Sequence, residues 1–197
     1  KDLSDIVEKI KSENLRNSIF IDNTASQVVS DHYELILNAG ASIATCNKIA
    51  CSSDYNRYSN LKRLAKENVL EFKYETCVGA ALPVIKTIQD LVLSGDQITS
   101  VEAVLSGSLN FIFNTYDGSS SFADVVAEAK KLGYTEPNPL IDLSGVDAIR
   151  KILILARESG LEINFEDVVN EGFLPEECLQ AEDTEDLFKA LEKNDAH

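Results

Sequence analysis

Most of the residue patterns that reveal a chemical function at once are missing from this sequence. Its 197 residues include no methionine and only two histidines, His32 and His197. No two cysteines stand at Cys-x-x-Cys spacing, so the ligand pattern of a structural zinc site is absent. His32 lies in a pattern typical of a helix, and we favour a surface or packing role for it over that of a catalytic base.

The nine glycines are also uninformative by themselves. No two of them are separated by a single residue, which excludes both the Gly-x-Gly-x-x-Gly fingerprint and the phosphate-binding P-loop. If the first third of the chain is a nucleotide-binding fold, we expect its phosphate-binding turn to lie upstream of Lys1. The absence of methionine points the same way, to a piece of a longer protein.

Positive charge is scarce. The 18 Lys and Arg residues face 33 Asp and Glu residues, for a net charge of −15. A nucleic-acid or anionic-membrane surface needs a basic patch, so both partners are disfavoured. No apolar run reaches the length of a transmembrane helix, and no apolar core of a signal peptide follows Lys1. The composition, with 44% hydrophobic and 26% charged residues, is typical of a globular protein. Because no secretion signal is seen, we expect the protein to be cytoplasmic and its thiols to be free.

Apolar periodicity in the first third alternates between the two regular structures. Helical spacing covers residues 2–11, 27–38 and 55–67, and short apolar runs that indicate strands cover 18–22, 41–45 and 69–74. Strands alternating with helices at this rhythm favour a parallel, doubly wound sheet. We therefore predict the α/β fold class, beginning with a partial Rossmann-like half over residues 1–74.

The rest of the chain has a different pattern. Helices are predicted at 84–93, 121–132, 144–159 and 184–193, and a strand in an antiparallel sheet at 98–105. Residues 134–143 contain Pro137 and Pro139 and are predicted to be irregular. We expect an α+β catalytic and dimerisation domain over 75–181, followed by an acidic C-terminal helix over 182–197.

Two polar clusters follow predicted strands of the first third. One is Asp-Asn-Thr-Ala-Ser at 22–26, and the other is Thr-Cys-Asn-Lys at 45–48. Ligands of open α/β sheets bind beyond the carboxyl ends of the strands, which makes both clusters candidates for a cofactor site. The alternatives are that Thr24 or Ser26 caps a helix and that Lys48 is a solvated loop residue.

A third cluster is denser in charge. Glu136, Asp142, Asp147 and Lys151 fall within sixteen positions, and the last two share one face of a predicted helix. A lysine among carboxylates keeps its proton and can donate it to a carbonyl oxygen. The alternative is structural: Ser144 and Asp147 would form a capping box, and Asp147 and Lys151 an ordinary surface pair.

The residues around this third cluster resemble a family signature. Residues 129–151 read Ala-x3-Gly-Tyr-Thr-Glu-Pro-x-Pro-x2-Asp-Leu-x-Gly-x-Asp-x3-Lys, which is similar to the signature of homoserine dehydrogenases. The segments 22–26, 45–48, 75–83 and 105–113 resemble the family in the same order, so the resemblance covers roughly residues 18–160. Within the family, the sequence looks most like the dehydrogenase part of bifunctional aspartokinase/homoserine dehydrogenases.

This resemblance implies NAD(P)H-dependent interconversion of aspartate 4-semialdehyde and homoserine, with the choice of NAD or NADP left open. It implies that Lys151 is the catalytic proton donor and Asp142 the acid that supports it. It places the substrate between Glu136, Asp147, Tyr134, Gly107 and Ser108. It places the cofactor near Thr24, Ala25, Thr45, Asn47 and Lys48. It also implies a sodium ion held by the backbone carbonyls of Glu75, Val78, Ala80 and Leu82.

The resemblance further implies a homodimer and a covalently linked aspartokinase domain. The chain departs from the family at Leu140-Ile141, where Arg-Asp is common, at Asn138, a frequent Asp, and at Ala81, a frequent Gly. These changes affect substrate positioning and leave the four charged residues intact. Two alternatives stay open: a non-catalytic dimerisation or interaction fragment, and another amino-acid dehydrogenase. Without a phosphate-binding turn, we expect no homoserine oxidation from these 197 residues alone.

Overall fold

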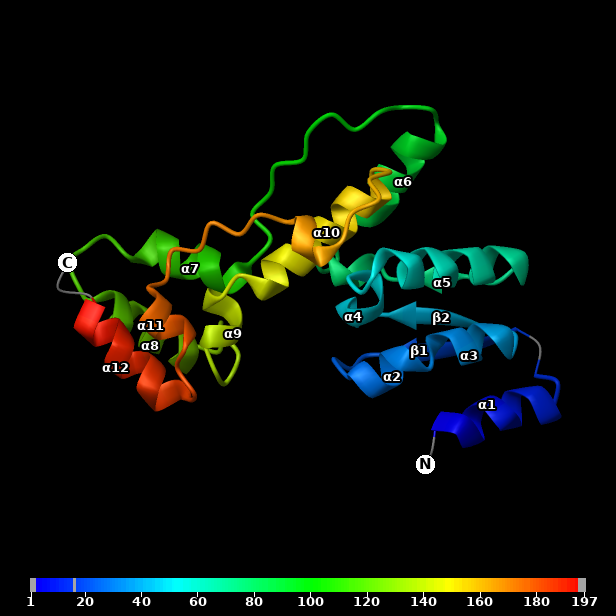
Figure 1. Ribbon diagram of the computed structural model, residues 1–197, viewed down its shortest axis with the longest axis horizontal. Coiled ribbons are helices and arrows are strands. Elements are labelled where there is room, and N and C mark those ends of the chain that lie inside the picture. The colour runs from blue at the N-terminus through cyan, green and yellow to red at the C-terminus, as the bar shows by residue number, and fades with distance from the viewer. Residues whose placement is uncertain (1–2, 16, 195–197) are drawn as a thin grey trace. The chain divides into compact units, whose positions relative to one another are not determined.

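A computed structural model describes residues 3–15 and 17–194, which form two compact units (Figure 1). Of these residues, unit 1 comprises 3–15, 17–101 and 150–168, and unit 2 comprises 102–149 and 169–194. The helix α10 (Val146–Glu158) begins in unit 2 and continues in unit 1. Each unit is defined by the residues that pack together and contains two separate stretches of the chain, whereas each predicted domain is a single continuous stretch.

Unit 1 contains a three-stranded parallel sheet in the order β1-β2-β3. The strands are β1 (Ser18–Asp22), β2 (Ala41–Thr45) and β3 (Phe72–Lys73). Between them lie the helices α2 (Gln27–Asp31), α3 (Tyr33–Asn38), α4 (Lys48–Cys51) and α5 (Tyr55–Glu67). Parallel neighbours need such crossovers, and their carboxyl ends meet at one edge. Asp22 pairs with Thr45 in the register, which brings the two polar clusters together as expected.

Apolar side chains from α1 (Leu3–Ser12), α3, β2 and α5 form the core of unit 1. Its buried members include Val7, Ile10, Ile36, Leu37, Ile43 and Leu61. Each such side chain contributes about 1.5–3 kcal/mol by leaving water. The spacing of these residues in the sequence is what predicted the helices and strands around them.

Three predicted elements of unit 1 differ from the structure. The helix predicted over 27–38 is interrupted at His32, whose backbone N–H donates to the Val29 carbonyl three residues back (3.1 Å) and ends α2. The strand predicted over 69–74 is only β3, because Val69 has a φ of 56°, which is not extended backbone. The strand 18–22 was predicted to be buried, yet Ile19 and Ile21 are 65% and 66% exposed, since alternate residues share one face of β1 and this face is exposed.

The remaining elements of unit 1 are short or helical. They are the 3-10 turn η1 (Glu75–Cys77), α6 (Val84–Leu93), the later part of α10, and the 3-10 turn η2 (Phe165–Asp167). The predicted strand at 98–105 is wrong, because these residues have no regular secondary structure. Alternating side chains alone do not make a strand without a partner that accepts the backbone hydrogen bonds.

Unit 2 is helical in the part that the structure describes. It contains α7 (Gly107–Thr115), α8 (Phe122–Lys131), α9 (Leu140–Leu143), α11 (Glu176–Leu179) and α12 (Thr184–Asn194). Its core includes Ile112, Val126, Leu143, Cys178 and Leu187. The antiparallel sheet predicted for this region is absent from these described residues. The segment predicted to be irregular ends in α9, since Pro139 has a φ of −61° that suits a helix start.

No helix in residues 3–15 or 17–194 combines the length and the apolar character that crossing a bilayer demands.

Candidate active site

A buried hydrogen-bond network lies at the carboxyl ends of β1 and β2 in unit 1. The Tyr33 hydroxyl donates to Asp22 Oδ2 (2.6 Å) and lies 2.7 Å from Thr45 Oγ1. Asp22, Tyr33 and Thr45 are 2%, 0% and 6% exposed. Burial of an acid is costly unless hydrogen bonds replace its water, and this network supplies them.

The same carboxylate arranges the two loops that were predicted to meet the cofactor. The Thr24 backbone N–H donates to Asp22 Oδ1 (2.8 Å), and the Asn47 side chain donates to Asp22 Oδ2 (3.1 Å) and to the Ser26 carbonyl (3.0 Å). The Asn47 backbone N–H in turn donates to Thr45 Oγ1 (2.8 Å). Asn47 therefore ties the loop after β1 to the beginning of α4, whose first residue is Lys48.

These contacts change how the predicted cofactor residues are understood. Thr45 and Asn47 are buried and their side chains serve the network, whereas Thr24 and Ala25 are exposed and Lys48 is half-buried. Ser26 is the N-cap of α2, and Asn47 is the N-cap of α4. The helix-cap interpretation is thus right for Ser26, and it holds alongside the predicted cofactor site.

The charge of Asp22 is stabilised within the network. Burial alone would raise the pKa of this carboxyl, but the hydrogen bonds from Tyr33, Thr24 and Asn47 outweigh it, and the pKa lies below its usual value. Burial and the adjacent Asp22 raise the pKa of the Tyr33 phenol, which therefore stays a hydrogen-bond donor at neutral pH. An ionised acid and a protonated phenol are the states in which both hydrogen bonds persist.

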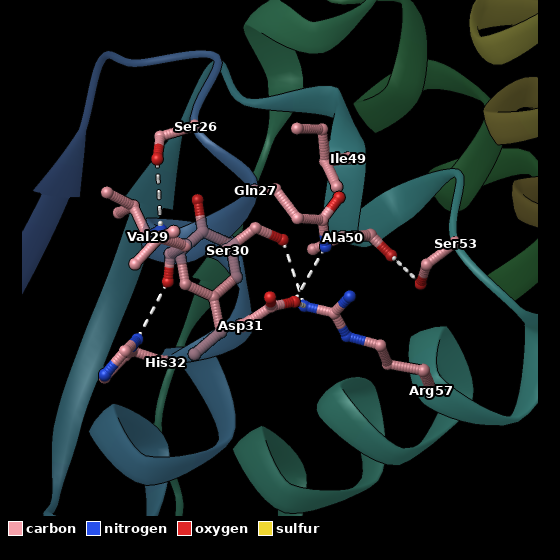
Figure 2. A network of polar contacts seen from close by, with 12 residues as sticks. Ser26, Gln27, Val29, Ser30, Asp31, His32, Ile49, Ala50, Ser53 and Arg57 are labelled. Carbon is pink, nitrogen blue, oxygen red and sulfur yellow. Dashed lines mark hydrogen bonds and ion pairs between the residues drawn. The ribbon is translucent and has the colours of Figure 1, made fainter.

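Figure 2 shows how α2 is fastened to α5 beside these loops. Gln27 Nε2 donates to Asp31 Oδ1 (2.7 Å), and Arg57 Nη2 donates to Ser30 Oγ (3.0 Å) and lies 3.1 Å from Asp31 Oδ1. Ser53 Oγ donates to the carbonyl of Ala50 (2.7 Å), which closes the turn after α4.

A cavity of about 380 Å³ opens within unit 1 beside this face. It is lined by Gln27, Ile49, Ser52, Ser53, Asp54, Arg150, Asn164, Phe165 and Glu166. Ile49 follows Lys48 in the chain, and Arg150 precedes Lys151. The cavity therefore borders both helices that carry a candidate functional lysine.

The predicted sodium loop contains a turn with left-handed backbone at two successive residues. Gly79 and Ala80 have φ values of 78° and 52°, a left-handed conformation that is unusual for alanine. The carbonyls of Val78 and Ala80 accept no hydrogen bond from the described residues, whereas those of Glu75 and Leu82 accept from Val78 and Val84. Free carbonyl oxygens are ligands that a hard cation takes, so the loop fits the expected ion.

The Glu75 side chain has a different task. Its two carboxylate oxygens accept the backbone N–H groups of Ile85 and Lys86, both at 2.9 Å. It therefore caps the beginning of α6, where an acid is favoured by the helix dipole. The prediction for Glu75 concerned its backbone carbonyl and not its side chain, and that prediction stays untested.

In unit 2 the structure brings Asp142 together with Ser108 and the Glu136 backbone. Ser108 Oγ donates to Asp142 Oδ1 (2.8 Å), and the Glu136 backbone N–H donates to Asp142 Oδ2 (2.9 Å). Ser106 Oγ lies 2.9 Å from Ser108 Oγ and accepts the Leu109 N–H as the N-cap of α7. Both oxygens of Asp142 are therefore held by the start of α7 and by the loop before α9.

Three other predicted substrate residues of unit 2 precede Asp142 in the chain. The Tyr134 ring stacks on Phe111 with centroids 4.4 Å apart and is 53% exposed, which leaves much of it accessible to a ligand. Glu136 and Gly107 are exposed as well. Gly107 is the first residue of α7.

Asp147 and Lys151 lie on α10, four residues apart and so on one face of the helix. Both are half-buried. The Ser144 hydroxyl donates back to the Ile141 carbonyl (3.2 Å) at the end of α9, and the capping box between Ser144 and Asp147 stays a prediction.

Sequence reasoning missed two supporting residues. Tyr33 belongs to no motif in the sequence. Its hydroxyl contacts Asp22 and Thr45, which become neighbours only when β1 and β2 pair. Ser106 precedes the predicted Gly107 and Ser108, and its place before a helix is a signal that could have identified it as a cap. Asp22 was in the motif but was not assigned a role.

Two family models match the chain. The model described as "Homoserine dehydrogenase, NAD binding domain" matches residues 1–75, and the model "Homoserine dehydrogenase" matches residues 83–196. Both matches agree with the fold class predicted from the sequence, a nucleotide-binding part followed by a catalytic part.

Individual proteins agree with these models. A bifunctional aspartokinase/homoserine dehydrogenase of Buchnera aphidicola is 41% identical over 188 residues, 95% of this chain and 23% of the relative. A homoserine dehydrogenase of Paracoccidioides brasiliensis is 44% identical over 154 residues, 74% of this chain and 41% of the relative. The chain thus spans less than half the length of either relative.

A solved structure extends the comparison to the fold. A hyperthermophilic archaeal homoserine dehydrogenase in complex with NADPH has a TM-score of 0.65 and 33% identity, over 72% of this chain and 43% of the other. The two family models together cover nearly the whole chain, so the resemblance seen in the sequence is confirmed. The chain belongs to the homoserine dehydrogenase family.

Proposed function

We propose that the protein containing this chain is an NAD(P)H-dependent homoserine dehydrogenase that interconverts aspartate 4-semialdehyde and homoserine. The observation that carries the proposal is the Asp142 site of unit 2, in which Ser108 and the Glu136 backbone hold both carboxylate oxygens. Two of the segments that resemble the family, 105–113 and 129–151, supply the parts of this one arrangement. The family match and the NADPH complex of the archaeal relative support the reaction and the cofactor.

In this proposal the chain's own groups provide proton transfer and substrate orientation. The bound reduced dinucleotide supplies a hydride to the aldehyde carbon. Lys151 donates a proton to the aldehyde oxygen, where negative charge develops, so it stabilises the transition state more than the substrate. The family resemblance assigns Glu136 and Asp147 to the substrate ammonium and makes Asp142 the acid that supports the lysine.

Unit 1 serves the cofactor in this proposal. Thr24 and Ala25 lie exposed in the loop after β1, and Thr45 and Asn47 fix that loop and the start of α4 from beneath. Lys48, the first residue of α4, lies at the junction of cofactor and substrate. The backbone carbonyls of Glu75, Val78, Ala80 and Leu82 would hold the sodium ion that the resemblance implies.

We further propose that the protein is a homodimer in the cytoplasm and is covalently joined to an aspartokinase. The linked aspartokinase is supported by several relatives, among them the Buchnera protein, that are bifunctional aspartokinase/homoserine dehydrogenases.

Assay of the complete protein tests the function. Homoserine with NAD or NADP should produce reduced cofactor, whereas serine and threonine at the same concentration should produce little. Lys66→Ala, an exposed lysine near the end of α5, serves as the control for a Lys151→Ala variant. A complete protein that binds NADPH but does not oxidise homoserine would refute the proposal.

A further inference from the structure

Two charged residues are buried at the end of α10, the helix that carries Lys151. Arg157 and Glu158 are only 4% and 5% exposed. A charge removed from water is costly unless well-placed dipoles or opposite charges compensate it. The partners of these two residues therefore show what α10 is held against within unit 1.

Arg157 is held mainly by backbone carbonyls. Its Nη1 donates to the Cys51 carbonyl (2.8 Å), Nη2 to the Ser53 carbonyl (2.7 Å), and Nε and Nη2 to the Ile163 carbonyl (3.0 and 2.9 Å). The guanidinium also lies over the rings of Tyr55 and Tyr58, 5.6 and 5.1 Å from their centroids. In the described part of unit 1, no carboxylate lies within ion-pair distance of it.

The acceptors of Arg157 belong to the segment that follows Lys48. The helix α4 has four residues, from Lys48 to Cys51, so the Cys51 carbonyl lies one helical turn from Lys48. Lys151 lies six residues before Arg157 on α10, a rise of about 9 Å. One guanidinium thus links the two helices that carry the candidate lysines.

Glu158 fixes the last turn of α10 from a second direction. Its carboxylate accepts hydrogen bonds from the hydroxyls of Tyr58 and Tyr74, the latter at 2.5 Å, from Gln89 Nε2 (2.8 Å) and from Lys62 Nζ (3.0 Å). These donors come from α5, from the residue after β3 and from α6. The helix is therefore restrained against sliding and rotation.

We propose that Arg157 is a positioning residue for the dehydrogenase reaction, which holds Lys151 at a fixed distance from Lys48 by joining α10 to the end of α4. The proposal rests on the proposed function of the two lysines. The guanidinium carries five N–H donors spread over a rigid planar fork, which suits three separated carbonyls, whereas the three donors of a lysine ammonium leave from a single nitrogen on a flexible chain. A misplacement of about 1 Å in a reacting group can lower a rate by about a hundredfold.

The test uses the complete enzyme with Arg157→Lys, which keeps the charge and loses the fork. Arg63→Lys is the matched control, because Arg63 is an exposed residue of α5 that pairs with Glu67 on the same helix. Rates and NADPH binding by fluorescence are measured well below the melting temperature. We expect kcat to fall about tenfold to hundredfold, while the Kd of NADPH and the KM of homoserine stay within about threefold.

If Arg157 had a purely structural role, the folded fraction of the Arg157→Lys variant would react at the wild-type rate. Arg157→Lys with a lower melting temperature but kcat within about twofold of wild type would overturn the proposal. If that variant does not fold, Arg157→Ala is compared with and without added guanidinium at low concentration. Recovery of kcat by guanidinium but not by methylammonium supports the proposal, and equal effects of the two cations refute it.

The inference and the proposed function fail in different ways. A wild-type enzyme that binds NADPH and does not oxidise homoserine would refute both. An active wild-type enzyme that is indifferent to Arg157→Lys would refute the inference alone.

Discussion

The most direct test of the unit 1 network is to remove one hydroxyl group by Tyr33→Phe. The substitution keeps the fully buried ring and deletes the donor to Asp22 and the partner of Thr45. A hydrogen bond to a charged group is worth about 1.5–3 kcal/mol, and one between neutral groups about 1 kcal/mol. We therefore expect a loss of about 2–4 kcal/mol in the free energy of unfolding.

The same change should weaken cofactor binding. Asp22 positions Thr24, and Thr45 positions Asn47 before Lys48, so both loops lose a restraint when the hydroxyl is removed. We expect the Kd of NADPH for the complete enzyme to rise roughly 3–30-fold, which corresponds to about 0.7–2 kcal/mol. Tyr116→Phe is the control, because no hydrogen bond of the Tyr116 hydroxyl is found within the described residues.

The pH dependence of stability gives this prediction a second observable. Because the pKa of folded Asp22 lies below the unfolded value of about 3.9, its stabilisation is present above that pH and is lost as the pH falls through the folded pKa. In Tyr33→Phe the folded pKa moves back up, so the stability difference from wild type should shrink below about pH 4. A difference that is the same at pH 3 and pH 7, or an unchanged Kd of NADPH, would refute this reasoning.

The remaining predictions concern the reaction, a second buried acid and assembly. Lys151→Ala should lower kcat by about 10²–10⁴ and change KM less, whereas Asp147→Ala should mainly raise KM, because in the proposed function Asp147 holds the unreacting end of the substrate. A kcat within about tenfold of wild type in Lys151→Ala would favour the surface-pair interpretation. The attraction of Lys62 and several hydrogen bonds overcome the effect of burial and lower the Glu158 pKa. Glu158→Gln should therefore destabilise the folded protein at pH 7 and much less below pH 4, which urea unfolding at both pH values would measure. The complete protein should be a dimer by light scattering, and a monomer at tens of micromolar would contradict this.

Local patterns predicted the elements whose sequence signals lie within a few residues of one another. The helix over residues 55–67 is α5, capped by Asp54, and the helix at 84–93 is α6, and both have the predicted bounds. Their apolar faces repeat at helical spacing, and each begins at a residue that favours a helix start. The strands at 18–22 and 41–45 were equally clear, because short apolar runs are bounded there by polar turns.

Features that depend on distant partners could not be predicted in this way. Residues 98–105 alternate like a strand but lack a ladder, and the hydroxyl of Tyr33 gains its role only when β1 and β2 pair. The signature identified Asp142, yet the donors that hold it, Ser108 and the Glu136 N–H, lie 34 and 6 residues away. Sequence spacing shows which residue types are present, and tertiary contacts decide which of them support one another.

The support of the candidate residues differs between the units in a way that bears on mechanism. In unit 2, Asp142 is oriented by two donors at the ends of a short loop and a helix, which leaves the nearby Tyr134 and Glu136 exposed to a ligand. In unit 1, the later part of α10 is fixed by buried charges whose partners are carbonyls, phenols, an amide and a lysine. A group that must deliver a proton to one developing oxygen gains most from rigid support, because every loose degree of freedom lowers the fraction of productive encounters. For the proton donor that we propose at Lys151, the buried Arg157 and Glu158 provide this rigid support on the same helix, although their burial by itself is costly for folding.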